Sequence, residues 1–210
     1  MNLKDSRPAR KQDARFEKSR TAMREAMLGL LEEIPLRQVT GAMVAKRAGI
    51  GYATFFRHYD DVYALLLDTV TTLVDDLAAR MMPALLAADT RGAAAALIDY
   101  VVERSGLCRA LLAGSGADLR AMLLSHVVDH VAALPRLSPS LLPPRLAIRL
   151  AVAGTVEVLE WWLRDAPGSD PQTVAAILDR VVMTPLAAAD DNPPAHLAVE
   201  KGAGTRKRSL

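Results

Sequence analysis

Aromatic side chains are concentrated in one short stretch of this sequence. Five of the nine Phe, Trp and Tyr residues lie between Tyr52 and Tyr63. Flat rings and small apolar groups can contact thymine methyl groups, and an arginine such as Arg57 can bond a guanine edge or a phosphate oxygen. This stretch therefore carries the side-chain chemistry of nucleic-acid recognition.

Helical periodicity gives this stretch two different faces. The spacing predicts a helix from about Gly51 to Tyr59, in which Phe55 and Tyr59 share a face at i and i+4 and pack inward. A helix of nine residues is roughly 13 Å long, short enough for a major groove. The outward face then consists of Tyr52, Ala53, Phe56 and Arg57.

A second short helix is expected just before it. Thr40 is a suitable N-cap because its hydroxyl can accept from an amide of the first turn, and the helix runs from Gly41 to Ala48. Gly49 ends it, since a residue without Cβ tolerates positive φ. Two helices joined by a glycine turn form a helix-turn-helix. The alternative is that this unit is structural only, within a helical ligand-binding or protein-interaction module.

Charge is distributed unevenly along the chain. Residues 1–60 hold twelve Lys and Arg against seven Asp and Glu, whereas residues 61–190 hold ten against fifteen. The asymmetry indicates a basic module that meets an anionic partner, joined to a mildly acidic body. The alternative is two solvated faces of different sign.

The whole chain is predicted to be all-α, because apolar residues recur at helical spacing and no useful segment alternates as a strand does. We expect a basic flexible arm over residues 1–18, a helix-turn-helix domain over 19–61, a larger helical domain over 62–189, and a disordered basic tail over 190–210. The helices expected in the domain over residues 62–189 span residues 62–82, 91–105, 106–113, 117–134, 144–165 and 171–188.

Several function classes receive little support. No stretch free of Asp, Glu, Lys and Arg exceeds nine residues, far short of the roughly 20 that span a bilayer, so no membrane partner is expected. Met1 to Lys18 has no apolar signal core, which favours a cytoplasmic location. His126 and His130 stand at i and i+4 without a third ligand of telling spacing, so no metal is assigned.

Catalysis is not expected either. Ser115 and Ser125 lie in no nucleophile elbow, and no phosphate-binding glycine loop occurs. Cys108 is the single cysteine and is expected to pack as a small hydrophobe. We therefore expect no enzyme activity and no cofactor.

The segment from Val39 to Tyr59, with Val-Thr, Val-Ala, Ala-Gly-Ile and Thr-Phe-Phe-Arg-His-Tyr in order, resembles the DNA-binding motif of the tetracycline-repressor (TetR-like) family of transcription regulators. The resemblance covers about residues 20–67. It implies a homodimeric, ligand-responsive regulator, most simply a repressor, that binds a palindromic double-stranded DNA operator. By the same resemblance the DNA-contacting positions are Thr40, Tyr52, Ala53, Thr54, Phe56 and His58, to which the outward face adds Arg57.

Three positions depart from the family pattern. Phe56 replaces a tyrosine that would bond phosphate, Ala42 stands where a base-reading polar residue can occur, and Val62 replaces a common phosphate-binding lysine. Fewer polar anchors are therefore expected, and the basic residues of the arm could compensate for them.

The resemblance also places an effector pocket and a dimer interface in the second domain. The last two long helices are expected to pair with their symmetry mates, with one of Trp161 and Trp162 inside and the other at an interface. An apolar or amphipathic small molecule is expected between the helices, because small side chains leave room there. Its contact residues are expected to be Tyr100, Glu103, Arg104, Glu157 and Trp161.

Overall fold

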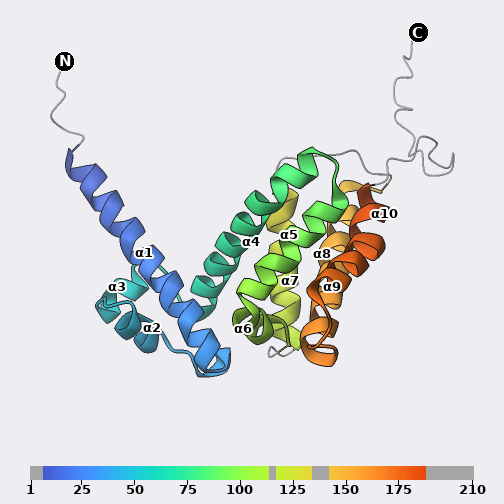
Figure 1. Ribbon diagram of the computed structural model, residues 1–210. Coiled ribbons are helices and arrows are strands. Elements are labelled where there is room, and N and C mark those ends of the chain that lie inside the picture. Colours follow the sequence, from blue (N-terminus) through green and yellow to red (C-terminus); the bar gives the residue numbers. More distant parts are fainter. Residues whose placement is uncertain (1–6, 114–116, 134–141, 188–210) are drawn as a thin grey trace, which may run out of the picture.

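The computed structural model describes residues 7–113, 117–133 and 142–187. Every regular element in these ranges is a helix, which confirms the all-α prediction. Three N-terminal helices form one group and the remaining helices form a larger body beside it (Figure 1). The α-helices are α1 (Arg7–Glu33), α2 (Gly41–Arg47), α3 (Tyr52–Phe56), α4 (Val62–Leu86), α5 (Thr90–Glu103), α6 (Ser105–Cys108), α7 (Ala117–Ala133), α8 (Pro144–Asp165), α9 (Pro171–Leu178) and α10 (Thr184–Ala187), with a 3-10 turn η1 (Leu36–Gln38) and two π-helical segments, η2 (Arg109–Ala113) and η3 (Asp179–Met183).

Helix α1 begins much earlier than the sequence suggested. The prediction of a flexible arm through Lys18 is wrong from Arg7 onward, because the chain is helical there, while residues 1–6 lie outside the described residues. Ala, Arg, Lys, Gln and Glu dominate this stretch and all favour helix. Pro8 stands in the first turn, where a missing N–H disrupts no intrahelical bond. The first turns of α1 project beyond α2 and α3 (Figure 1).

The turn between α2 and α3 has the geometry expected of a helix-turn-helix. Thr40 Oγ1 accepts a hydrogen bond from Met43 N at 3.3 Å, which confirms the N-cap. Gly49 has a φ of 65°, and Ile50 N donates to Ala45 O at 3.0 Å. This is a glycine C-cap in which left-handed backbone lets two amides bond back to the helix.

One apolar core holds the N-terminal group together and extends into α4. Helix α1 buries an apolar stripe with helical spacing, and most of the side chains that meet it come from α2, α3 and α4. Because α4 shares this core, the N-terminal domain is packed directly onto the helix that leads into the body. The buried members include Met23, Met27, Leu30, Leu31, Val44, Phe55, Leu65, Leu66 and Val70.

Helix α4 connects the two parts of the molecule. Asp61 is its N-cap, with Oδ1 accepting from Ala64 N at 2.7 Å. The predicted end at Met82 is too early, because α4 continues through Pro83 to Leu86. A proline this near the end removes one backbone hydrogen bond, and the last turn still closes through Ala87 N to Pro83 O at 3.2 Å.

The body has a second core, formed mainly by α5, α8, α9 and η3. The bounds of α5 and α8 agree closely with the predicted helices, whereas the helix predicted over residues 171–188 is interrupted by η3, and residues 188–210 lie outside the described part. Trp162 is buried and donates from Nε1 to Ser169 O at 3.3 Å, while Trp161 is exposed. One of the two tryptophans was expected to lie inside, and it is Trp162. No helix within the described ranges is long and apolar enough to cross a membrane.

Candidate nucleic-acid interface

Helix α3 presents aromatic rings on both of its faces. Phe55 is fully buried and Tyr59 is 7% exposed, whereas Tyr52 and Phe56 are 57% and 50% exposed. This confirms the orientation predicted from spacing. The outward surface therefore carries two large aromatic rings together with Ala53 and Arg57, which are also exposed.

The two outward rings support each other. Tyr52 and Phe56 meet edge to face with centroids 5.0 Å apart, and Phe56 lies 5.2 Å from the buried ring of Phe55. Gly41 leaves space for the buried Phe55 ring, because a Cβ at Gly41 would stand 3.1 Å from that ring. Edge-to-face pairs are a favourable aromatic geometry, so the exposed rings are held at a fixed orientation.

Helix α3 is shorter than predicted. It ends at Phe56, and the amides of His58 and Tyr59 both donate to Phe55 O, at 2.9 and 3.0 Å, in the closing turn. Five helical residues are roughly 7.5 Å long, about half the expected rod. Arg57 follows the helix, and its guanidinium donates to Thr54 Oγ1 at 3.1 Å, so its side chain lies back over the half-buried Thr54.

His58 does not lie on the outward face. Its ring stacks on Phe16 of α1 at a centroid distance of 4.0 Å, and Nε2 is 2.8 Å from Ser19 Oγ. Burial, with the nearby positive charges of Arg57 and Arg20, lowers the pKa of His58. The sequence predicted that His58 faces the DNA backbone. In the structure α3 has already ended before His58, so the chain turns back and the imidazole packs against α1.

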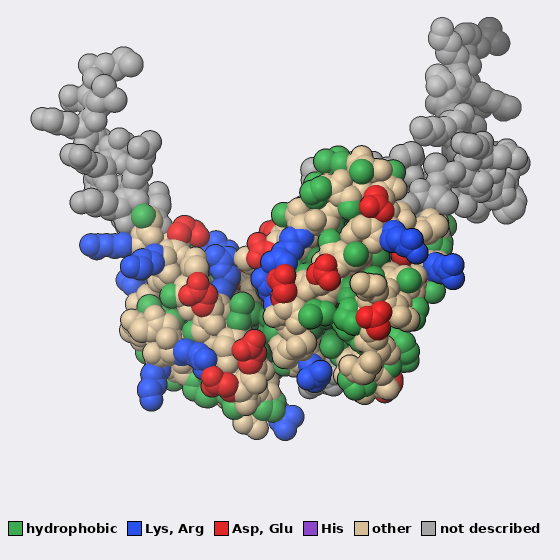
Figure 2. Space-filling model, viewed as in Figure 1, with side chains coloured by type: hydrophobic (Ala, Val, Ile, Leu, Met, Phe, Trp, Pro, Cys, Tyr) green, Lys and Arg blue, Asp and Glu red, His purple; other side chains and the backbone are tan. Residues whose placement is uncertain are grey.

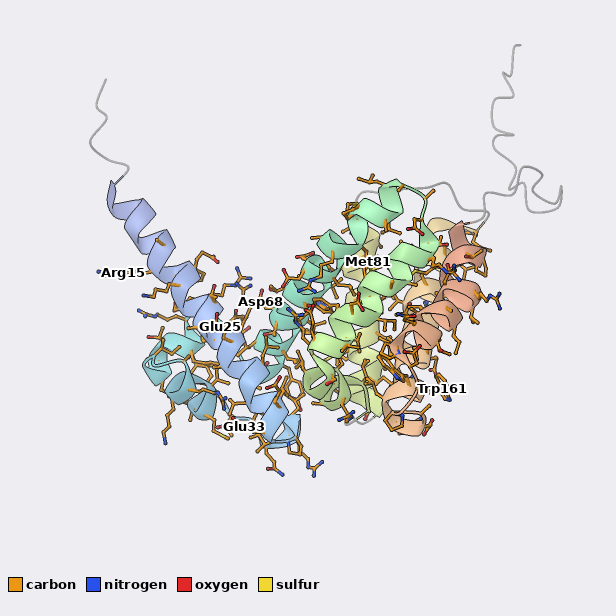
Figure 3. All side chains as sticks on the ribbon, viewed as in Figure 1. Arg15, Glu25, Glu33, Asp68, Met81 and Trp161 are labelled. Carbon is orange, nitrogen blue, oxygen red and sulfur yellow. The ribbon has the colours of Figure 1, made fainter. Side chains whose placement is uncertain are left out.

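A polar cluster that no sequence pattern indicated ties the N-terminal domain to α4. Asp68 accepts from Tyr59 Oη at 2.6 Å and from Arg24 Nη1 at 3.4 Å, and it forms an ion pair with Arg20. Asp68 lies on the side of α4 that faces α1 (Figure 3). Tyr59, Arg20 and Arg24 are far from Asp68 in sequence or lie in another element, so no local pattern reports this cluster.

The electrostatics of this cluster favour a charged Asp68. Burial alone would raise its pKa, but hydrogen bonds from Arg20 and Tyr59 and the charges of Arg20 and Arg24 outweigh burial and lower the pKa. Burial and the hydrogen bond to Asp68 raise the pKa of Tyr59 to about 12. At neutral pH the cluster therefore holds one carboxylate, two guanidinium groups and a neutral phenol.

Exposed basic side chains lie on the N-terminal group. Lys and Arg project from several edges of the N-terminal group (Figure 2). Thr40 and Lys46 are exposed on α2, and Arg15 is exposed on α1 and points away from the body (Figure 3). Ala42 is exposed without a polar group, and Val62 is half-buried.

The body contains a small apolar cavity. Its volume is about 90 Å³, and Arg120 is the one charged residue among those that line it. Arg120 Nη1 is 2.9 Å from Glu160 Oε2, and Glu160 is only 3% exposed. The other lining residues, from α4, η2, α7 and α8, are Val70, Leu111, Leu112, Leu123, Leu124, Val127, Val152 and Val156.

None of the five predicted ligand residues lines this cavity, although Tyr100, Glu103 and Arg104 lie together, with Arg104 Nη1 3.0 Å from Glu103 Oε2. Tyr100 is buried and donates to Leu73 O at 3.0 Å, with Arg104 over its ring. Glu103 pairs with Arg80 at 2.7 Å on the surface. Glu157 pairs with Arg120 and Trp161 is exposed, both on α8. The helices were predicted well, but which faces meet is decided by packing across the fold.

The histidines of α7 bond to α4 instead of forming a metal site. His126 Nε2 lies 2.7 Å from Thr71 Oγ1, and His130 Nε2 lies 2.6 Å from Asp75 Oδ1. Among the residues with a described placement, no group of three His, Cys, Asp or Glu could hold a metal. Burial raises the pKa of Cys108 to about 11, which suits a packed thiol.

Solved structures of transcription regulators share this arrangement. A TetR transcriptional regulator from Streptococcus agalactiae superposes with a TM-score of 0.58 at 18% identity, over 83% of this chain and 98% of that one. The chain has the TetR fold. FadR from Bacillus subtilis, in complex with stearoyl-CoA, matches with a TM-score of 0.57 at 14% identity, over 79% of this chain and 98% of that one.

A third structure with the TetR fold is NalD, the secondary repressor of a multidrug efflux pump in Pseudomonas aeruginosa. It matches with a TM-score of 0.54 at 20% identity, over 81% of this chain and 96% of that one. No family model and no curated protein matches by sequence. The likeness in fold extends over about four fifths of the chain in each of these structures.

Proposed function

We propose that this chain is a DNA-binding transcriptional repressor that a small molecule releases from its operator. The observation that carries this proposal is the asymmetry of α3, where Phe55 is fully buried while Tyr52 and Phe56 stand exposed and braced beside Arg57. Large aromatic side chains that are exposed on a short helix leave apolar surface in contact with water unless a partner covers them. A major groove is a partner of suitable width, flanked by phosphates for the surrounding basic residues.

The DNA-contacting residues are Thr40, Tyr52, Ala53, Thr54, Phe56 and Arg57, with His58 as a support behind them. In this proposal Thr40, the N-cap of α2, and Lys46 on α2 contact phosphate, while the rings of α3 contact base edges. The helical α1, with Arg15 exposed, extends the basic surface and takes the role first given to a flexible arm. Its backbone is already ordered, so binding through it costs less conformational entropy than binding through a flexible arm.

The active form is a homodimer. Apolar side chains on α8 and η3 are exposed in the single chain, and an interface would remove them from water. These side chains are Leu146, Leu150, Trp161 and Val181. A twofold axis through this face would give two recognition helices and a palindromic operator, with half-sites about one helical turn, roughly 34 Å, or a multiple of it apart.

The effector occupies the apolar cavity between α4, α7 and α8. Its volume of about 90 Å³ is well below the roughly 300 to 1,000 Å³ of a typical ligand pocket, so a ligand must push these helices apart to enter fully. Arg120 offers one polar contact at the wall. The structure of FadR with stearoyl-CoA supports an apolar or amphipathic effector for a body of this fold.

Movement of α4 would reach the DNA through Asp68. Val70 lines the cavity and Asp68 lies two residues away on the same helix, bonded to Tyr59 just after α3. A ligand that displaces α4 therefore displaces the turn that follows the recognition helix. The ligand acts as an effector only if it binds one arrangement better than the other.

The competing function is a helical binding module whose helix-turn-helix is structural only. Its exposed α3 would then contact a protein or nothing, and duplex DNA would bind no better than a polyanion. Our proposal also includes a cytoplasmic location and no catalytic activity.

Selection of bound genomic DNA fragments tests the proposal against this competitor. Purified full-length protein is incubated with genomic DNA fragments and the retained fragments are sequenced. Enrichment of an inverted repeat supports the proposal. Uniform recovery of all fragments contradicts it.

A further inference from the structure

A second and larger hollow lies at the junction between the N-terminal domain and the body. Its volume is about 690 Å³, within the range of small-molecule pockets. One wall is the end of α1 with the chain that follows it, residues 31–37, and the floor includes Tyr63 at the start of α4. The opposite wall comes from η2 and the beginning of α7, at residues 110, 111, 117–119 and 122.

The junction cleft has an apolar interior. Its surface is formed largely by aliphatic side chains of both domains, and Tyr63 exposes about half of its side chain there. A half-exposed tyrosine next to aliphatic walls offers a ring face to a flat or cationic group. The aliphatic members include Leu31, Ile34, Leu36, Leu119 and Met122.

The charges that line the cleft are mainly negative. Glu32, Glu33 and Asp118 supply three carboxylates, against the single guanidinium of Arg37. Glu33 is bonded to Arg47 at 2.7 Å and stands at the lower end of α1 in Figure 3. Glu32 forms no ion pair with any residue placed in the structure, so its charge is available to a ligand.

We propose that the junction cleft binds an amphipathic organic cation, with its apolar body against Leu119 and Met122 and its positive group near Glu32 and Tyr63. Aromatic and aliphatic walls with a carboxylate at the edge match this class in shape and charge. An organic anion of the same size would meet Arg37 but also the carboxylates of Glu32 and Asp118, since among the described residues only Glu33 of the three is paired with an arginine, so the lining favours a cation.

Such a ligand would bridge the two domains. Residues 31–37 belong to the N-terminal domain, while Leu119 and Met122 belong to the body. Binding would therefore favour the relative orientation that keeps both walls in place. The site is distinct from the apolar cavity behind α4, since Leu111 is the one residue that lines both.

Fluorescence polarisation with the full-length protein tests this inference without DNA, so its failure is separate from failure of the proposed function. The probe is rhodamine 6G, a flat lipophilic cation, and the comparison probe is fluorescein, an anion with a related ring system. We expect saturable binding of rhodamine 6G and none of fluorescein over the same concentration range.

Variants locate the bound dye. Glu32→Gln should weaken rhodamine binding about two- to fivefold through loss of an exposed charge contact. Tyr63→Ala should weaken it about fivefold through loss of the ring. Asp99→Asn, which neutralises an exposed carboxylate on α5, is the matched control and should leave binding unchanged. Equal binding of the two dyes, or rhodamine binding that is unchanged in the Glu32→Gln/Tyr63→Ala double variant, would overturn the inference.

Discussion

The phenol of Tyr59 donates a 2.6 Å hydrogen bond to the carboxylate of Asp68. Tyr59 directly follows the turn that ends α3, and Asp68 lies in α4 with Arg20 and Arg24 of α1 bound to the same carboxylate. One side chain of α4 thus bonds both α1 and the turn that follows α3. We therefore expect a shift of α4 to move both.

Removing the phenol should loosen this connection. Tyr59→Phe deletes a hydrogen bond to a charged acceptor, so we expect the free energy of unfolding to fall by about 1 to 3 kcal/mol in urea titrations. Tyr63→Phe is the matched control, because Tyr63 is half-exposed and its hydroxyl has no bond to a described residue. Equal stability of the two variants would show that Tyr59 and Asp68 are not coupled.

Adjacent phenylalanines separate stability from recognition. Phe55 is fully buried and Phe56 is half-exposed. Phe55→Ala should lower stability by about 3 to 5 kcal/mol as a large core truncation, whereas Phe56→Ala should leave the melting temperature nearly unchanged and weaken operator binding. Thermal melts in the opposite order would mean that α3 faces the other way.

His58 should make the N-terminal domain less stable in mild acid. Burial lowers its pKa below the usual 6.5, so as pH falls below 6.5 the unfolded chain takes up a proton that the folded protein resists. The stabilisation of the folded protein by neutral His58 is therefore complete above about pH 6.5, and it is lost as the pH falls toward the lowered pKa of His58.

The pH effect is measured as a double difference. Urea midpoints are compared at pH 7.5 and 5.5 in the wild type and in His58→Leu, and the other histidines cancel because both proteins contain them. We expect a larger loss of stability at pH 5.5 in the wild type. The same loss in both proteins would assign the acid sensitivity to other groups.

Arg120 should be needed to keep Glu160 buried. Arg120→Met leaves a nearly inaccessible carboxylate without its partner at 2.9 Å, and we expect a loss of about 3 to 5 kcal/mol in chemical denaturation. Arg120→Met/Glu160→Leu removes both charges and should recover most of that loss. A double variant as unstable as the single one would mean that Arg120 acts through packing.

Local signals in the sequence were enough to place most helices and the facing of α3. Thr40 and Gly49 act within a few residues of themselves, so their capping chemistry was enough to predict where α2 begins and ends. Phe55 and Tyr59 share a face through helical spacing alone. Residues 7–18 were misjudged because their composition suits both a solvated helix and a mobile basic segment, and no apolar stripe decides between the two.

Contacts between distant elements could not be predicted. The ring of His58 packs on Phe16, 42 positions earlier in the sequence, and Asp68 gathers partners from α1 and from the end of α3. The sequence could not show the partner of Tyr100 for the same reason: Tyr100 lies on the predicted helix, and its hydroxyl is bonded to α4. Helical periodicity predicts which face of each helix is buried, but it does not predict which other helix that face packs against.

Footprinting on an operator recovered from genomic fragments tests the central claim most directly. The wild type should protect two inverted half-sites with centres about 34 Å, or a small multiple of that, apart, and log affinity should fall linearly with log salt. Tyr52→Ala/Phe56→Ala should abolish the footprint while the melting temperature stays close to that of the wild type. A protein that protects no discrete site, or a double variant that protects the same site equally well, would contradict the assignment of α3 as a recognition helix.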